Sequence, residues 1–544
     1  MNFSHYTDPV LESAEELLKK RGRLSLSHRF DVDLGLKAEE YSIKETEGML
    51  TISGGSASAV MFGVGRLIRE PGFRGSSSPD KSYRGIYFAT HFGNWYDNAS
   101  EDEIDRYLED LVIWGCNTIN VWFDRHQFRN IAEPRAQSKL KNLKHILKKS
   151  ARLGMKNYLT SLANEAYADS PTDLRADWVG LKNGYKTDCI TGHYHVELCP
   201  SKPGALDLLI RWHEEMLDAF SDVPIHYFGI FCYDQGGCTC ADCAPYGANG
   251  YWKIIPRLSD LIRKKFPDCK IVLSTWRFDQ FTDGEWDHLR RNTVLLHKYA
   301  DMLAVDNCDL ENLNELEDDI PAIGFTDISM LHQLPWGGYG ANPYPAFLET
   351  FRKEDRLCGN NAYSEGIFED VNKIMLLGSE WDTNCSAWEM LRKYAAFYFG
   401  QETSELIPEI SRLMERNLDH SADVAQNGKT FCAYFTDQVD PEIEWKLFYT
   451  CRSLDKDRAE RCMELVKQAE MLMTKEKSTS WRWRLYRLRA EIDMVLANGG
   501  EPEESAIREL HDMYHCGSGT LPCLLPPSGD CWRKIISERR PSLV

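Results

Sequence analysis

The sequence predicts a (β/α)8 TIM barrel, an α/β fold, with a small amino-terminal α/β domain before it and a carboxy-terminal helical domain after it. From about residue 81 to 390, short apolar segments alternate with amphipathic segments of helical period, and about eight such units fit this span. Mixed short elements come before it, and mainly helical periods come after it. We therefore place the domains at residues 1–80, 81–390 and 391–544.

The amino-terminal domain combines helical periods with a hairpin. Its apolar spacing and its turn residues at Glu45–Gly48 predict two helices, two strands and a linker rich in glycine, serine and proline. The helices are expected at Leu11–Lys20 and Ala57–Arg69, the strands at Tyr41–Ile43 and Met49–Ile52, and the linker at Gly72–Pro79.

The central region supplies the barrel strands and their helices. The expected strands are Tyr83–Thr90, Thr118–Phe123, Lys156–Ser161, His226–Cys232, Ile271–Thr275, either Leu295–Lys298 or Ala322–Phe325 as the sixth, and Asn361–Ser364 as the seventh. The eighth strand has no clear candidate. A doubly wound sheet is the rival fold, but it needs a glycine-rich phosphate turn after its first strand, and His91–Trp95 is not one.

Helical periods dominate after residue 390 and predict a packed helical domain. The expected helices are Ser386–Phe399, Glu405–Leu418 and Ser480–Ala497.

The composition is that of an acidic globular protein. Hydrophobic residues make up 43% and charged residues 27%, and the net charge is -19. Such a chain repels phosphate backbones, so we expect no nucleic-acid partner. There is no apolar run of membrane-spanning length and no secretory core, so we expect a cytoplasmic protein without a membrane partner. Most of the 17 cysteines are then expected to be reduced, and the oligomeric state stays open.

Polar and aromatic residues gather at the carboxyl ends of the expected strands, where barrels of this kind carry active sites. Carboxylates after four or more strands exceed what packing needs, because an unpaired charge in a cleft costs solvation energy. A pocket is therefore expected there, with Trp276 and Trp336 as its walls. The residues are Arg84, His91, Trp95, Trp122, Asp124, Asn164, Glu165, Asp234, Gln235, Trp276, Asp279, Asp327, Trp336, Tyr363 and Glu365.

The sharpest of these segments is Tyr233-Asp234-Gln235-Gly236-Gly237, which directly follows the apolar strand Phe228–Cys232. Its glycines allow a sharp turn and a close approach of the backbone to a ligand. The alternative interpretation is a plain turn, since Asp and Gly are common turn residues for backbone reasons alone.

Three stretches resemble the family 20 glycoside hydrolases, which are β-N-acetylhexosaminidases, and their relatives in families 123 and 67. Tyr41–Arg69 resembles the small α/β domain that precedes their barrels. Tyr83–Tyr87 resembles their first barrel strand, in which an arginine, here Arg84, grips hydroxyls of the terminal sugar. Tyr233–Gly236 stands where these enzymes carry an Asp-Glu pair after the fourth strand, and Tyr363 resembles a tyrosine that hydrogen-bonds the acetamido group.

The resemblance implies substrate-assisted catalysis, which is a known exception to the usual arrangement of two carboxylates. Asp234 takes the role of the aspartate that orients the 2-acetamido group and stabilises charge on its nitrogen. The acetamido oxygen attacks the anomeric carbon, and the residue next to the aspartate protonates the leaving oxygen and later deprotonates water.

Gln235 departs from this pattern, because an amide cannot donate a proton as an acid does. Three explanations stay open: an inactivated Glu→Gln form, a natural pseudoenzyme, or an acid elsewhere. We favour the first, because glutamine is nearly isosteric with glutamate. Asp327 and Glu365, at later strand ends, either bind sugar hydroxyls or serve as the base of an inverting enzyme similar to the family 67 α-glucuronidases.

The loop after the fourth strand also carries three cysteines, Cys238, Cys240 and Cys243. Three thiols so close together suit a tetrahedral structural zinc, with Cys199, or a histidine such as His193 or His195, as the fourth ligand. The alternative is three reduced loop cysteines without a metal.

Together these expectations describe an exo-acting, retaining β-N-acetylhexosaminidase that binds a small glycan with a terminal β-GlcNAc or β-GalNAc. No cofactor is expected for catalysis. The alternatives are an inverting glycoside hydrolase similar to the α-glucuronidases and a glycan-binding pseudoenzyme. Asp234 and Gln235 are the expected catalytic positions, and the expected substrate-binding residues are Arg84, His91, Trp122, Trp276, Asp327, Trp336, Tyr363 and Glu365.

Overall fold

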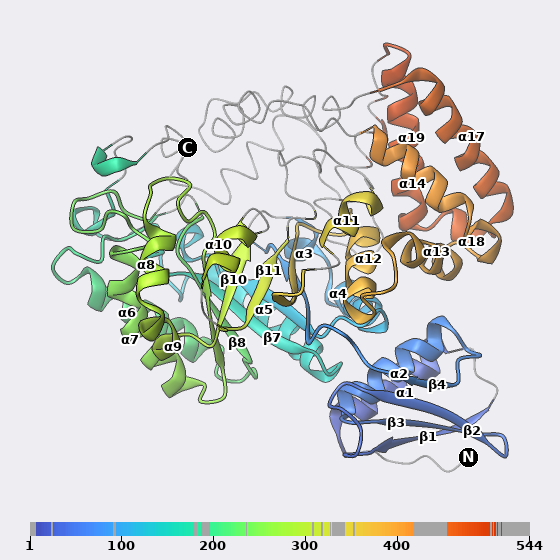
Figure 1. Cartoon of the computed structure of the whole chain (residues 1–544), viewed down its shortest axis with the longest axis horizontal. Coiled ribbons are helices and arrows are strands. Elements are labelled where there is room, and N and C mark those ends of the chain that lie inside the picture. The colour runs from blue at the N-terminus through green and yellow to red at the C-terminus, as the bar shows by residue number, and fades with distance from the viewer. Residues whose placement is uncertain are drawn as a thin grey trace.

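The chain forms a barrel, a small sheet with two helices, and a group of carboxy-terminal helices (Figure 1). The computed structural model describes residues 7–22, 26–90, 94–177, 182–185, 196–234, 237–306, 309–316, 319–326, 328, 343–351, 354–417, 454–500, 503, 505–506, 509 and 513. Among the helices within these ranges, none combines the length and the apolar character that a membrane span requires.

Eight parallel strands close the barrel in the order β10-β11-β12-β5-β6-β7-β8-β9. The closing pair is β12 with β5, which stay in register from Gly359↔Tyr83 to Ser364↔Phe88. Closure excludes the doubly wound sheet and confirms the predicted fold class. The strands are β5 (Tyr83–Phe88), β6 (Thr118–Trp122), β7 (Lys156–Leu162), β8 (Tyr227–Phe231), β9 (Lys270–Ser274), β10 (Met302–Asp306), β11 (Ala322–Phe325) and β12 (Leu357–Ser364).

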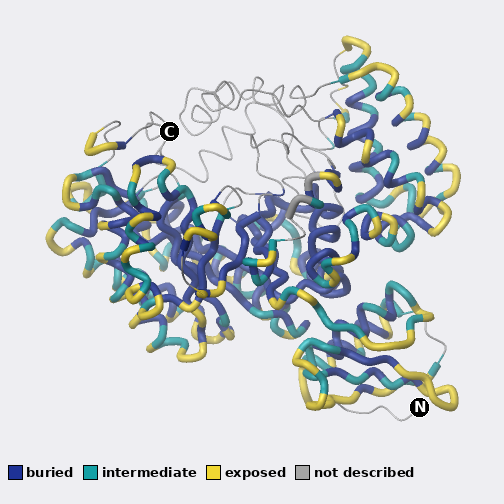
Figure 2. The backbone as a smooth tube through the Cα atoms, in the orientation of Figure 1, coloured by how far each residue is buried: buried dark blue, intermediate teal, exposed yellow. Residues whose placement is uncertain are grey.

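Amphipathic helices surround the barrel, and Figure 2 shows the buried residues concentrated in the strands and the exposed ones on the outer helices. In α4 a capping box between Ser100 and Glu103 fixes the first turn. The helices of this region are α3 (Trp95–Asn98), α4 (Glu101–Ile113), α5 (Pro134–Arg152), α6 (Ala205–Ala219), α7 (Gly250–Lys265), α8 (Glu285–Arg291), α9 (Thr293–Tyr299), α10 (Leu310–Glu315), α11 (Pro345–Phe351) and α12 (Asp370–Trp381).

The amino-terminal sheet has the strand order β1-β3-β2-β4, and α2 lies between it and the barrel. Two glycines of α2 allow this close packing. A Cβ at Gly63 would lie 2.8 Å from the Ile52 side chain of β3, and one at Gly65 would lie 2.8 Å from the Ile113 carbonyl oxygen of α4. The elements are α1 (Pro9–Arg21), β1 (Ser27–Val32), β2 (Tyr41–Thr46), β3 (Met49–Gly54), α2 (Ala57–Arg69) and β4 (Gly75–Ser77).

The carboxy-terminal helices pack beside α12, and one buried arginine joins them to the barrel. Arg482 donates to Asp370 of α12 at 2.7 Å and to Asp110 of α4 at 2.9 Å. Its guanidinium lies 3.9 Å from the ring centroid of Tyr398. The helices are α13 (Ala387–Tyr398), α14 (Leu406–Arg416), α17 (Lys456–Leu472), α18 (Lys475–Ser478) and α19 (Trp481–Ala497).

Three strand assignments made from the sequence are wrong. Leu295–Lys298 lies within helix α9, where Leu296 is buried but Leu295 is exposed, so its apolar residues do not form one buried strand. The sixth strand is β10, which the sequence reading missed, and Ala322–Phe325 is therefore the seventh. Asn361–Ser364 belongs to the eighth strand, β12. The expected linker Gly72–Pro79 contains β4, which pairs with β2.

Candidate active site

An aromatic floor closes the centre of the barrel near the carboxyl ends of its strands. Phe325 of β11 is at its middle. Its ring centroid lies 5.2 Å from that of Trp276, 5.6 Å from Phe231, 5.8 Å from Tyr363 and 5.9 Å from Tyr87. All five side chains are buried. Such rings offer an apolar surface against which the C–H groups of a sugar can pack.

Three carboxylates act electrostatically on Tyr87, and each comes from the end of a different neighbouring strand. Burial raises the pKa of Tyr87 well above its usual value, and the negative charges of Asp234, Asp124 and Glu165 raise it further. Tyr87 therefore keeps its proton and can donate a hydrogen bond. Asp124 and Glu165 are buried, whereas Asp234 is half-buried and is the member of the set open to a ligand.

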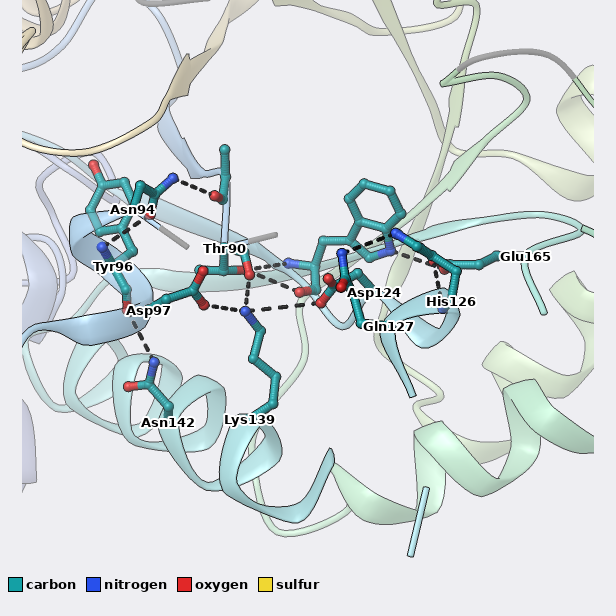
Figure 3. A network of polar contacts seen from close by, with 12 residues as sticks. Thr90, Asn94, Tyr96, Asp97, Asp124, His126, Gln127, Lys139, Asn142 and Glu165 are labelled. Carbon is teal, nitrogen blue, oxygen red and sulfur yellow. Dashed lines mark hydrogen bonds and ion pairs between the residues drawn. The ribbon is translucent and has the colours of Figure 1, made fainter. Parts of the chain in front are cut away.

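Glu165 is held by groups from the β6 end. Its carboxylate accepts a hydrogen bond of 3.1 Å from the Trp122 indole Nε1 and lies 2.6 Å from His126 Nδ1. Arg125 Nε is 3.9 Å away. Figure 3 shows His126 beside this carboxylate. Its position is therefore fixed by the protein itself.

Lys139 of α5 braces the ends of the first two barrel strands from below (Figure 3). Its ammonium contacts the Thr90 carbonyl oxygen and the Asp97 carboxylate closely, and lies 3.9 Å from Asp124 Oδ1. Thr90 in turn donates to the Trp122 carbonyl oxygen at 3.0 Å. One cation thus neutralises part of the acidic charge and fixes two loops of the barrel mouth.

The segment that carries Asp234 is anchored through its neighbour Tyr233, whose hydroxyl donates to the buried carboxyl of Glu285. The same carboxyl accepts from Gly247 N at 2.6 Å and from Asp279 N at 3.0 Å. Glu285 therefore ties the loop after β8 to the loop after β9 behind the site. Burial raises its pKa from the usual 4.5 to about 8, and the hydrogen bonds from Tyr233 and the two amides only partly oppose this.

Glu285 should make stability fall as the pH rises. The unfolded carboxyl ionises near 4.5 and the folded one near 8, so the folded state binds the extra proton between these values. The contribution of Glu285 to the free energy of unfolding is fully present below pH 4.5. It declines by up to about 1.4 kcal/mol per pH unit between pH 4.5 and 8. We expect melting temperatures of Glu285→Gln to depend less on pH than those of the wild type.

The matched control is Glu315→Gln. Glu315 is exposed and pairs with Arg290, so this variant should keep the wild-type slope. Parallel melting curves for wild type and Glu285→Gln between pH 5 and 8 would contradict the raised pKa.

The structure brings several of the expected residues together at the barrel mouth. Trp276 and Tyr363 belong to the floor, Trp122 holds Glu165, and Asp234 is at the rim. Glu365 follows β12 and accepts a 3.0 Å hydrogen bond from the Tyr363 hydroxyl. Four expected residues, His91, Gln235, Asp327 and Trp336, lie outside the described residues, as do His193 and His195.

Arg84 does not belong to this site, so its expected role in gripping a sugar is wrong. It is the second residue of β5 and lies at the amino-terminal end of the barrel, with no exposed surface. Its guanidinium donates to the carbonyl oxygens of Gly115 and Lys81 and pairs with Glu39 at 2.9 Å. The reason is strand alternation: Tyr83 and Tyr87 face the barrel interior, so Arg84 points outward.

The four cysteines Cys199, Cys238, Cys240 and Cys243 come together beside the Asp234 segment. Their sulfur atoms all lie within 4.8 Å of one another. Cys199 Sγ is 3.7 Å from both Cys240 Sγ and Cys243 Sγ.

The site also contains Tyr87, Phe325 and His126, which were not predicted from the sequence. Tyr87 could have been predicted from the alternation Tyr83, Gly85, Tyr87, because every second residue of a barrel strand faces inward. His126 could not be found this way, since it belongs to the short 3₁₀ turn Arg125–Gln127 after β6, and its contact with Glu165 depends on that turn.

Comparison with known proteins gives structural likeness only. No family profile and no curated protein sequence matches the chain. Among solved structures, a family 89 glycoside hydrolase from Clostridium perfringens, a double Glu→Gln variant in complex with its substrate GlcNAc-α-1,4-galactose, matches with a TM-score of 0.61 and 13% identity over 90% of this chain and 61% of that one.

Two further structures belong to other glycoside hydrolase families. A family 138 enzyme that targets the pectin rhamnogalacturonan II has a TM-score of 0.59 and 11% identity, over 93% of this chain and 70% of that one. A family 20 exo-β-N-acetylglucosaminidase from Vibrio harveyi, in complex with N-acetylglucosamine, has a TM-score of 0.49 and 14% identity, over 73% and 74%. At these identities the likeness to the family 89 and family 138 structures shows the fold alone.

Proposed function

We propose that this chain is an exo-acting glycoside hydrolase that removes a terminal N-acetylhexosamine from a small glycan. The observation that carries the proposal is the position of Asp234. It is half-buried at the carboxyl end of the fourth barrel strand, near Tyr87, at the mouth of a barrel closed by an aromatic floor. A carboxylate that is both fixed and reachable at this place suits contact with a substituent of a sugar ring.

The proposed reaction is retaining and substrate-assisted. Asp234 accepts a hydrogen bond from the acetamido N–H, and the acetamido oxygen attacks the anomeric carbon as the bond to the leaving oxygen breaks. The negative charge of Asp234 stabilises the positive charge that develops on the acetamido nitrogen. An acid at position 235 supplies the proton for the leaving oxygen, and water then opens the cyclic intermediate. Gln235 cannot supply this proton.

Restoring the acid tests this proposal. We expect Gln235→Glu to raise the rate of hydrolysis of aryl β-GlcNAc or aryl β-GalNAc by about 10²–10⁴-fold, the usual contribution of a general acid. The matched control is Gln401→Glu, an exposed position distant in the sequence, which should change nothing. If Gln235→Glu releases neither amino sugar, the proposal is wrong, and if it still binds N-acetylglucosamine, the chain is a glycan-binding pseudoenzyme.

A second candidate is a glycosidase that uses two carboxylates on an α-linked sugar. Glu365, at the end of the eighth strand, is held by Tyr363 beside the aromatic floor, and the family 89 neighbour was solved with an α-linked GlcNAc substrate. Under this candidate Glu365→Gln abolishes activity on aryl α-GlcNAc or α-glucuronide, whereas Asp234→Asn has little effect. NMR of the first-formed anomer separates a retaining from an inverting reaction.

A further inference from the structure

The four-cysteine cluster has the dimensions of a tetrahedral metal site. A zinc ion with four thiolate ligands at about 2.3 Å holds its sulfurs about 3.8 Å apart. Cys199 Sγ lies 3.7 Å from the sulfurs of Cys240 and Cys243, and every pair of the four sulfurs is within 4.8 Å. The two sulfurs of a disulfide lie about 2.0 Å apart, so these distances fit four ligands of one metal ion and do not fit two disulfides.

Neighbouring donors complete the environment that four thiolates need. Asp177 N donates to Cys238 Sγ at 3.4 Å, and Ser201 Oγ lies 3.0 Å from Cys243 Sγ. The ammonium of Lys253, from α7, donates to Ser201 Oγ at 2.6 Å. Zinc with four thiolates carries two negative charges, and these groups oppose that charge in a place where three of the four cysteines are buried.

We propose that Cys199, Cys238, Cys240 and Cys243 bind one structural zinc ion. Thiolate ligands and tetrahedral spacing favour zinc over magnesium or calcium, which prefer oxygen ligands. Four protein ligands leave no open position, so this metal braces the fold and does not activate water.

The metal holds the loop that carries Asp234, the residue on which the proposed function rests. Asp234 precedes Cys238 by only four residues. The Asn164 amide donates at 3.0 Å to the carbonyl oxygens of both Leu198 and Gly237, which precede Cys199 and Cys238. Asn164 is itself buried next to Glu165 at the end of β7. The site therefore links the loop after β7, which carries Glu165, to the loop after β8, which carries Asp234.

Metal analysis of the full chain, purified without a histidine tag, tests the site directly. We expect about one equivalent of zinc per chain by mass spectrometry, and X-ray absorption with four sulfur neighbours at about 2.3 Å. A chain that holds no metal, or a thiol count showing two disulfides, would overturn the proposal. Iron in place of zinc would overturn the identity of the metal.

A pair of cysteine variants provides the matched comparison. Cys240→Ser should lose the bound zinc and melt at a lower temperature. Cys269→Ser, at a buried site just before β9 and outside the cluster, should keep the zinc. Equal zinc content in both variants would contradict the assignment. If Cys240→Ser does not fold, the absorption spectrum of the wild type decides alone. None of these measurements uses activity, so a zinc-loaded Gln235→Glu variant that releases no amino sugar would overturn only the proposed hydrolase function.

Discussion

Asp234→Asn, introduced together with Gln235→Glu, is expected to lower kcat on aryl β-N-acetylhexosaminides by about 10²–10³-fold relative to Gln235→Glu alone, the typical effect of removing one group that stabilises charge in the transition state. The amide keeps the shape of the side chain but loses the negative charge. KM should change little, because the substrate before reaction carries no positive charge at the acetamido nitrogen. Steady-state kinetics measure both quantities.

The control for this experiment is Asp287→Asn, also introduced together with Gln235→Glu. Asp287 is an exposed residue of α8 that pairs with Arg290 and Arg291, so its charge is screened by solvent. It should leave kcat and KM unchanged. An unchanged kcat for the Asp234 variant would remove Asp234 from the chemistry and favour the candidate that uses Glu365.

Arg482→Met is expected to cost about 3–5 kcal/mol of stability, the usual cost of breaking a buried ion pair. The substitution leaves the carboxylates of Asp110 and Asp370 buried without the guanidinium that bridges them. Asp110 keeps a cationic partner, Arg21 of α1 at 2.5 Å, whereas Asp370 keeps the neutral hydroxyl of Tyr394 at 2.8 Å, so Asp370 suffers most. Denaturant unfolding and the melting temperature measure the loss of stability. Unfolding should begin where α19 contacts the barrel.

Arg487→Met, on the same helix, is the matched comparison. The Arg487 side chain is 38% exposed and pairs with Glu470 and Glu491, whereas that of Arg482 is 9% exposed. Its loss should cost at most about 1 kcal/mol, as for other surface pairs. Equal losses from the two substitutions would show that the buried network does not join the helices to the barrel.

Much of the architecture could be predicted from the sequence, because parallel barrel strands are apolar throughout and alternate with amphipathic helices. The elements that were missed lack such a signal. In β1, five of the six residues are not buried, and only Phe30 packs into the core. Met302–Asp306 is short, and the apolar residues of α9 just before it were a candidate for the sixth strand instead.

Site residues could be predicted where they lie at the ends of strands. They could not be predicted where the direction of a side chain within a strand decides its place. Asp234, Trp276, Tyr363 and Glu365 follow or end strands, so their position near the mouth could be inferred. Arg84 shows the limit, because its direction depends on which residues of β5 face inward. The four cysteines could be grouped because three are close in sequence, and the structure places Cys199 with them.

The packing around Arg84 means that the first 80 residues cannot be removed without disturbing the barrel. Glu39 supplies the only carboxylate recorded within ion-pair distance of Arg84 in the described part of the chain, and it also accepts a hydrogen bond from Asn117 at 3.0 Å. The Phe62 ring lies 5.4 Å from the same guanidinium. A truncated barrel would expose its own underside to water and lose the partner of a buried cation, so any shortened version must keep this cover or replace Arg84 as well.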